Sequence, residues 1–218
     1  MDRKRRYFVP RESQAGRSEE EKSLQEVETA MAMTFARTLE LRTTTPQIVA
    51  HSRRVSELAA AIGDLVEVTG GEKERLRLAA KLHEIGMVGV SADLLTRNSR
   101  LSPSELESVR AQARVGAEMV KVSHDPETAR LIEWQYDDYR YLRRYILDSR
   151  ELLLAGILRI ADVYDAMVAP RPYQEPVPES RRRQVLRIGS GTKFHPAAVF
   201  ALLHLADNPP AGMPASDA

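Results

Sequence analysis

The sequence predicts an all-α protein, a single helical bundle with a preceding N-terminal helix. Apolar residues recur at helical spacing, no segment alternates apolar and polar residues as a half-buried strand does, and capping patterns precede several apolar segments. The 218 residues suffice for one full-size domain that buries its core without disulfide bonds. We therefore expect a flexible lead-in over residues 1–22, a helical domain over 23–206 and a disordered tail over 207–218.

The first half of the chain is expected to form three helices and a tight loop. An apolar stripe defines the first helix. Thr45 and Pro46 suit the N-cap and first position of the second, which Gly70-Gly71 is expected to stop. The helices and the loop that follows them are expected at residues 24–41, 46–69, 72–85 and 86–90.

In the second half, capping residues mark the helix starts. Ser102 followed by Glu105 has the pattern of a capping box. Ser149 is expected to cap a long apolar helix that contains Asp162. The long helix is expected over 150–168, and the capping box precedes a helix that begins at 103. Three further helices are expected over 126–134, 179–188 and 196–206.

Composition excludes several classes of function. Without cysteine, the chain has no disulfides, thiolate zinc sites, iron–sulfur clusters or cysteine nucleophile. The net charge of +1 gives no field that attracts nucleic acid, and we expect the basic runs at 3–6 and 181–183 to be solvated. No apolar run approaches the roughly 20 residues of a membrane helix, and none follows the basic N-terminus, so we expect a cytoplasmic protein without membrane contact.

Scarce histidines and one aspartate are the candidates for chemistry. His51 lies near the start of the second expected helix, and His83-Glu84 ends the third. Asp162 interrupts an apolar helix, where a charge is costly unless it is compensated. A divalent metal is one compensating partner, and nitrogen with carboxylate ligands suits iron, manganese or zinc. Taken singly, each histidine is also consistent with an ordinary surface or core position, and the aspartate with an arginine partner.

Five motifs together resemble the HD-GYP branch of the HD phosphohydrolase superfamily. In chain order, they are His51-Ser52-Arg53-Arg54-Val55, Leu82-His83-Glu84-Ile85-Gly86, Ala161-Asp162-Val163-Tyr164-Asp165-Ala166, Arg171-Pro172-Tyr173 and Gly191-Thr192-Lys193-Phe194-His195-Pro196. The resemblance implies an HD-domain-like helical fold, a centre of two or three metals and hydrolysis of cyclic di-GMP. It also implies roles for six side chains: the metal ligands His51, His83, Glu84 and Asp162, and the substrate-phosphate residues Asp165 and Arg171.

Several positions depart from the family pattern. Glu84 replaces an aspartate, and Met87 replaces a lysine that faces the substrate phosphate. Gln112 and Gln135-Tyr136 stand where metal-binding histidines are usual, and the Gly-Tyr-Pro loop is missing. The remaining ligands suffice for one divalent ion (iron, manganese or zinc). The alternative is that the chain binds no metal. Because two-metal hydrolysis needs both ions, we expect little or no phosphodiesterase activity.

The segment 134–145 is rich in tyrosine, tryptophan and arginine. Three interpretations stay open for it: a helix or turn that covers the core edge, a nucleotide-stacking site, or a patch that binds a protein partner. For the whole chain, the leading hypothesis is a degenerate, catalytically impaired HD-GYP-like signalling module that binds a signalling protein, a cyclic dinucleotide or both. The alternative is a phosphohydrolase with a single metal ion. The sequence leaves the oligomeric state open.

Overall fold

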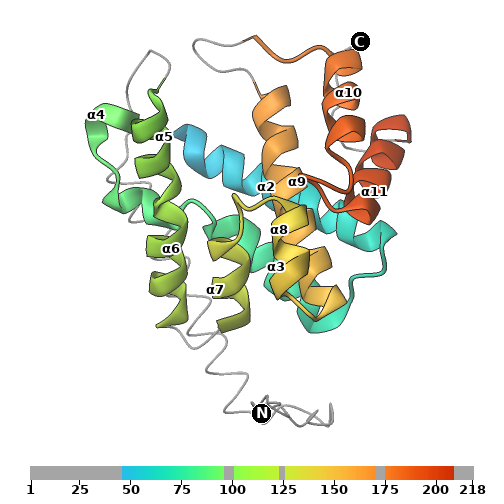
Figure 1. The fold of residues 1–218 in the computed structure, drawn as a ribbon, viewed down its shortest axis with the longest axis horizontal. Coiled ribbons are helices and arrows are strands. Elements are labelled where there is room, and N and C mark those ends of the chain that lie inside the picture. The colour runs from blue at the N-terminus through green and yellow to red at the C-terminus, as the bar shows by residue number, and fades with distance from the viewer. Residues whose placement is uncertain (1–45, 96–100, 123–125, 170–174, 209–218) are drawn as a thin grey trace, which may run out of the picture.

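Within the described residues, every regular element of this computed structural model is a helix (Figure 1). The structure describes residues 46–95, 101–122, 126–169 and 175–208. In chain order, the elements are α2 (Pro46–Leu65), α3 (Gly70–Leu82), the 3₁₀ helix η1 (Ile85–Gly89), α4 (Ala92–Leu95), α5 (Pro103–Arg110), α6 (Gln112–Lys121), α7 (Pro126–Glu133), α8 (Tyr139–Tyr145), α9 (Ser149–Val168), α10 (Glu179–Gly189) and α11 (Pro196–Asp207). The predicted all-α class is confirmed.

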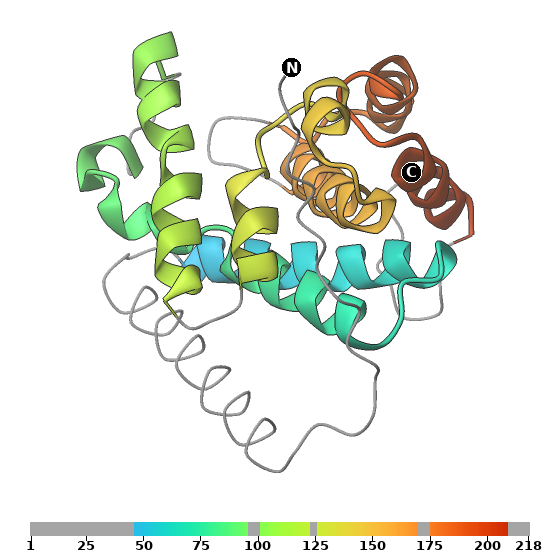
Figure 2. The same cartoon turned by 60° about the horizontal axis from the view of Figure 1, so that its bottom comes forward.

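The core is built around α9, which lies near the centre of Figure 1. This helix is buried without interruption from Leu152 to Leu158, and α2, α3, α7, α8 and α11 pack against it. Figure 2 shows α2 and α3 side by side, and α6 and α7 form a second close pair. The largest apolar side chains that are fully buried come from most of these helices: Ile62, Leu76, Leu131, Ile132, Ile157, Leu158, Ile160, Leu186 and Leu202. Their removal from water is the main favourable contribution to folding.

Two helix starts can be compared with their predicted caps. The capping box of α5 is confirmed: Ser102 Oγ accepts from the backbone N–H of Glu105 at 3.3 Å, and Glu105 Oε2 accepts from the N–H of Ser102 at 2.8 Å. The cap of α9 is Asp148, so the prediction of Ser149 is wrong. Asp148 has extended backbone angles, and its Oδ1 accepts from the N–H of Arg150 at 2.8 Å. Its negative charge also complements the helix dipole.

Helix α2 ends earlier than predicted, and the glycines at 70–71 do not stop it. Glu67 has φ of 58°, a left-handed conformation that usually favours glycine. The N–H of Val68 donates to the carbonyl of Gly63 at 2.8 Å, and that of Glu67 donates to the carbonyl of Asp64 at 3.4 Å. These are the two hydrogen bonds of a Schellman motif, which ends a helix by satisfying its last carbonyls.

Other predicted boundaries shift by a few residues. The third helix begins at Gly70 and ends at Leu82 instead of covering 72–85, and the expected loop at 86–90 is largely the 3₁₀ helix η1. The segment that begins at Pro103 forms two helices, α5 and α6, separated by a turn at Ala111. The lead-in at 1–22, the helix at 24–41 and most of the tail lie outside the described residues.

The sequence predicted that the arginine run on α10 is solvated, but this holds for only part of the run. Arg182 is buried, and its guanidinium carbon lies 5.7 Å from the centre of the Tyr164 ring. Arg183 pairs with Glu179 at 2.6 Å and with Asp207 at 2.8 Å. The prediction is therefore wrong for Arg182, because this helix packs one of its arginines against α9.

The aromatic segment contains α8, which places only part of its side chains in the core. Leu142 is buried, whereas Tyr141, Tyr145 and the arginines of this helix are exposed. Arg140 lies 4.9 Å from the Tyr141 ring centre, a cation–π distance. Among the described helices, none is long and apolar enough to cross a lipid bilayer.

Candidate metal centre

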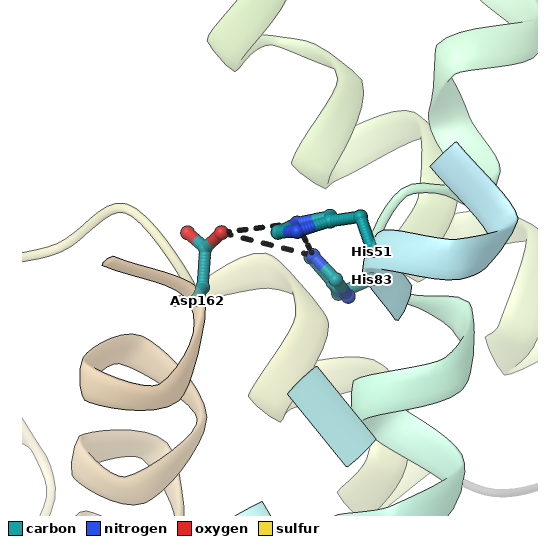
Figure 3. A group of neighbouring side chains, drawn as sticks. All are labelled: His51, His83 and Asp162. Carbon is teal, nitrogen blue, oxygen red and sulfur yellow. Dashed lines mark hydrogen bonds and ion pairs between the residues drawn. The ribbon is translucent and has the colours of Figure 1, made fainter. Parts of the chain in front are cut away.

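Three side chains from distant parts of the chain converge at one point (Figure 3). His51 comes from α2, His83 follows the last residue of α3, and Asp162 lies on α9. His51 Nε2 lies 3.3 Å from Asp162 Oδ1 and 3.3 Å from His83 Nε2, and His83 Nε2 lies 3.9 Å from Asp162 Oδ1. Within the described part of the chain, this metal triad is the only group of three or more side chains positioned to share an ion.

Two of the three distances between these atoms fit donors to a single transition-metal ion. Two donors that each lie about 2.1 Å from one ion are about 3.0 Å apart at a right angle and about 3.4 Å apart at the tetrahedral angle. Two of the observed distances, both 3.3 Å, fall in that range, and the third is 3.9 Å. The donor set of two imidazoles and one carboxylate suits iron, manganese or zinc.

When neutral, both histidines are held in the tautomer that metal binding requires. His83 is fully buried, and its Nδ1 donates to the carbonyl of Ala80 at 2.7 Å. His51 Nδ1 donates to Asp165 Oδ2 at 2.7 Å. Because each Nδ1 carries a proton that a neighbouring oxygen accepts, each neutral ring presents a lone pair on Nε2. Such partners behind a ligand fix the ring orientation and raise its basicity.

Asp165 is in turn held by Arg54. Arg54 Nε donates to Asp165 Oδ1 at 2.6 Å, and its Nη2 donates to Oδ2 at 2.9 Å. This paired arrangement and the bond from His51 use both oxygens of the buried carboxylate. The sequence predicted a phosphate contact for Asp165, which stays a prediction, and did not assign Arg54. The available signal was spacing: residues 51 and 54 share a face of α2, and residues 162 and 165 share a face of α9.

The pKa values at the centre reflect an excess of negative charge. Burial disfavours the charged form of His51, but hydrogen bonds with Asp162 and Asp165 and the charge of Glu84 outweigh it and raise the pKa of His51 to about 9. Burial disfavours the charged form of Asp162 too, yet His51, His83 and Arg159 hold its pKa below the ordinary value. A buried site that stabilises a proton so strongly is electrostatically suited to a cation.

The two remaining predicted site residues have different positions. Glu84 lies beside the triad, with Oε1 3.7 Å from His83 Nε2. Its role as a fourth ligand stays a prediction. Arg171 lies outside the described residues.

The positions where the family resemblance places further metal-binding histidines are occupied by a buried amide cluster. Gln112 and Gln135 are each 1% exposed, and their Nε2 atoms donate to the carbonyl of His83 at 3.1 and 2.9 Å. Gln112 Nε2 also donates to the Tyr136 hydroxyl at 3.1 Å. Burial and the nearby Glu84 raise the pKa of Tyr136, so its phenol stays neutral. This cluster therefore offers no anionic ligand.

A glycine contact fixes the position of this segment. A Cβ atom on Gly86 would lie 2.0 Å from the carbonyl oxygen of Gln112, which is far inside van der Waals contact. The backbone of η1 can therefore approach α6 only with glycine at this position. That approach holds His83 and Glu84, which immediately precede η1, against the amide cluster.

Comparisons with known proteins identify the family of this chain. The family model of the HD domain matches residues 48–167. The chain is 30% identical over 162 residues to a cyclic di-GMP phosphodiesterase of Thermotoga maritima, covering 71% of this chain and 44% of the relative. It is 28% identical to the 3'3'-cGAMP-specific phosphodiesterase 3 of Vibrio cholerae, covering 72% and 35%, and 27% identical to the response regulator RpfG of Xanthomonas campestris, a cyclic di-GMP phosphodiesterase, covering 71% and 42%. The chain thus spans less than half the length of these curated relatives.

A solved structure supports the fold. Bd1817, an HDG"Y"P protein from Bdellovibrio bacteriovorus, superposes with a TM-score of 0.60 at 18% sequence identity, covering 86% of this chain and 67% of that protein. The resemblance to HD-GYP proteins that the motifs indicated is confirmed. With the family match over residues 48–167 and two histidines and an aspartate gathered at one point, the chain belongs to the HD domain family.

Proposed function

We propose that this chain is a one-metal HD domain that acts in signalling mainly by binding a cyclic dinucleotide, with little phosphodiester hydrolysis. The observation that carries this proposal is the amide cluster next to an intact metal triad. Gln112 and Gln135 are neutral, and their amide nitrogens are engaged by the carbonyl of His83. The relatives that match this chain are phosphodiesterases of cyclic di-GMP or 3'3'-cGAMP, which supports the ligand class.

The metal triad would hold the ion through His51 Nε2, His83 Nε2 and Asp162 Oδ1, with Glu84 as the proposed fourth ligand. A bound divalent ion supplies a positive charge for phosphate oxygens and lowers the pKa of bound water. The protein contributes the orientation of the rings, since Asp165 and the Ala80 carbonyl fix their tautomers.

We expect impaired turnover because this chain lacks the positive charge that a second metal ion would supply. Two-metal hydrolysis stabilises both the attacking and the leaving oxygen of the phosphodiester. In this chain, the positions where further metal-binding histidines are usual hold two buried amides and a partly buried neutral phenol. Met87, at the position where the resemblance places a phosphate-facing lysine, is buried and uncharged. Loss of such preorganised charge removes several kcal/mol of transition-state stabilisation.

A second candidate function is a phosphohydrolase that uses one metal ion. The observation that favours it is the ring orientation at the triad. The Nε2 atoms of His51 and His83 already face one point, and Asp162 Oδ1 lies 3.3 Å from His51 Nε2. A site so organised is suited to activate water for the hydrolysis of a simpler phosphate ester.

Two further features of the proposal concern the surroundings of the domain. We infer a signalling protein as partner, because exposed tyrosines and arginines on α8, such as Tyr141 and Tyr145, are typical of binding hot spots. We also infer a cytoplasmic site of action, where the cyclic dinucleotides that its relatives hydrolyse would be encountered.

Metal and ligand titrations test the proposal. We expect the purified protein to bind one Mn²⁺ or Zn²⁺ per chain and to bind cyclic di-GMP in calorimetry only when loaded, with negligible hydrolysis. His83→Ala should abolish metal binding, whereas His204→Ala, at an exposed position on α11, should leave it unchanged. Two ions per chain and rapid hydrolysis would contradict the proposal. Rapid hydrolysis of a phosphomonoester with one ion would support the second candidate.

A further inference from the structure

Arg159 lies beside the metal triad and is not part of it. It precedes Asp162 by three residues on α9, so both side chains lie on the same face of this helix. Arg159 Nη1 is 4.0 Å from Asp162 Oδ2, whereas the other carboxylate oxygen, Oδ1, faces His51 and His83. The guanidinium therefore flanks the triad on the side of Asp162 that the histidines leave open.

The guanidinium of Arg159 is largely buried but poorly paired. Its side chain is 17% exposed, and its Nε is buried without a hydrogen-bond partner. The ion pair that it forms among the described residues, with Asp162, spans 4.0 Å, which is beyond hydrogen-bond length. Arg54, by contrast, donates two hydrogen bonds to Asp165 at 2.6 and 2.9 Å. Two arginines thus border the same centre: Arg54 is paired with a carboxylate through two hydrogen bonds, whereas Arg159 has a buried Nε without a partner.

Open donors on a largely buried cation call for an anionic acceptor. A guanidinium presents five N–H groups in a planar fork that matches the oxygens of a phosphate group. A buried donor without an acceptor destabilises the fold, so this guanidinium is not fully satisfied by the protein. The described acidic neighbour at 4.0 Å, Asp162, is already engaged with His51 through Oδ1. An oxyanion held at the triad would reach both the ion and Arg159.

We infer that Arg159 binds a phosphate group of the ligand at the metal triad, as a residue that recognises phosphate esters. This inference rests on the proposed function, since it assumes a phosphate-bearing ligand at that centre. Arg159 would supply the positive charge that Met87 lacks. It would do so from α9, in a different segment from η1, in which Met87 lies.

A purely structural role is the competing explanation. The positive charge of Arg159 helps to keep the pKa of Asp162 below its usual value, and it opposes the rise that burial causes in the pKa of Asp137. If Arg159 served only these neighbours, its removal would change stability without a specific effect on phosphate. The test therefore needs separate readouts for metal, phosphate and stability.

The experiment compares wild-type protein, Arg159→Gln and Arg159→Lys, each loaded with Mn²⁺ and titrated with inorganic phosphate by calorimetry. We expect phosphate to bind about tenfold more weakly to Arg159→Gln, with an intermediate loss for Arg159→Lys, which keeps the charge but not the fork. Mn²⁺ affinity should not fall in either variant, because Arg159→Gln removes a cation that repels the metal ion and Arg159→Lys leaves the charge unchanged. Arg182→Gln is the matched control: it also removes a buried arginine with an unpartnered Nε, and phosphate affinity should be unchanged.

Equal phosphate affinity in wild-type protein and Arg159→Gln would overturn the inference. If Arg159→Gln does not fold, Arg159→Lys decides by the same comparison. Failure of wild-type protein to bind Mn²⁺ would contradict the proposed one-metal function but not the inference about Arg159. Phosphate titration of the metal-free proteins would then test Arg159 separately, with the same tenfold difference expected.

Discussion

The Nδ1 atom of His51 donates a 2.7 Å hydrogen bond to Asp165, a residue that lies 114 positions further along the chain. The two residues come from α2 and α9, the helices that also supply two members of the metal triad. One helix–helix contact therefore both assembles ligands and selects the tautomer of one of them. Arg54 completes the contact by holding Asp165 through both carboxylate oxygens.

Replacement of Asp165 by asparagine should weaken metal binding without removing a ligand. The amide keeps the size of the carboxylate but loses the charge that orients His51 and raises its basicity. Loss of such a partner typically costs about 10- to 100-fold in metal affinity. Competition titration with Zn²⁺ or Mn²⁺ measures the change, and Asp207→Asn, at an exposed position on α11, is the control. Equal affinity in Asp165→Asn and wild-type protein would show that Asp165 does not position His51.

The stability of the metal-free protein should depend on pH through His51. Its pKa of about 9 in the folded state exceeds the ordinary 6.5, so protonation of His51 stabilises the fold fully below pH 6.5 and this contribution is lost as pH rises to 9. The expected loss is roughly 2–3 kcal/mol. Asp162 and Asp165 have lowered pKa values, so their contribution is present above pH 3.8 and is lost in stronger acid.

Urea denaturation in chelator at several pH values measures this dependence. His51→Gln has no titrating group at this position, so its free energy of unfolding should change much less between pH 6.5 and 9. A wild-type profile as flat as that of His51→Gln would contradict the raised pKa.

Gly86→Ala should destabilise the protein severely. The added Cβ would lie 2.0 Å from the Gln112 carbonyl oxygen and 2.7 Å from the Gly116 amide nitrogen, and both atoms belong to the backbone of α6. Because backbone cannot rotate away as a side chain does, η1 and α6 must separate, at an expected cost of about 3 kcal/mol or more. Thermal unfolding is the measurement, and Gly191→Ala is a comparison in which strain from a positive φ of 76° acts without any steric contact. A smaller loss for Gly86→Ala than for Gly191→Ala would refute the packing argument.

Glu67→Gly should stabilise the protein. Glu67 has φ of 58° at the end of α2, where glycine adopts the left-handed conformation without steric cost. The left-handed conformation costs a residue with a Cβ atom about 1–2 kcal/mol, and the greater freedom of glycine in the unfolded chain offsets part of this. The expected gain is therefore about 0.5–1 kcal/mol, seen as a higher melting temperature. Thr69→Gly, in the same connection but extended at φ of −130°, should give no gain. Loss of stability in Glu67→Gly would mean that the Glu67 side chain matters more than its backbone strain.

Sequence periodicity was sufficient for most helices, because the apolar spacing of a helix is a local property of the chain. Helix ends were harder to predict. Both Asp148 and Ser149 are good capping residues, and only their backbone angles show that Asp148 is the cap. A left-handed glutamate at position 67 has no sequence signature that would announce the end of α2.

At the centre, the family motifs identified the three residues of the metal triad, but not the side chains behind them. Arg54 lies within a quoted motif, yet its bond to Asp165 depends on how α2 crosses α9. The open donors of Arg159 are likewise a property of packing, since an arginine in an apolar helix is predicted to be paired or solvated. Partner side chains that come from distant segments are visible only in three dimensions.

The main-chain carbonyl oxygen of His83 links this residue to two other segments of the fold. This carbonyl accepts a hydrogen bond from Nε2 of Gln112 on α6 at 3.1 Å. It accepts another from Nε2 of Gln135, just past the end of α7, at 2.9 Å. The His83 ring of the proposed metal site and two neighbouring segments are thus linked through one atom. A displacement of α6 or α7 would move this residue, so we expect a molecule that binds their outer surfaces to alter the affinity of the proposed site for an ion.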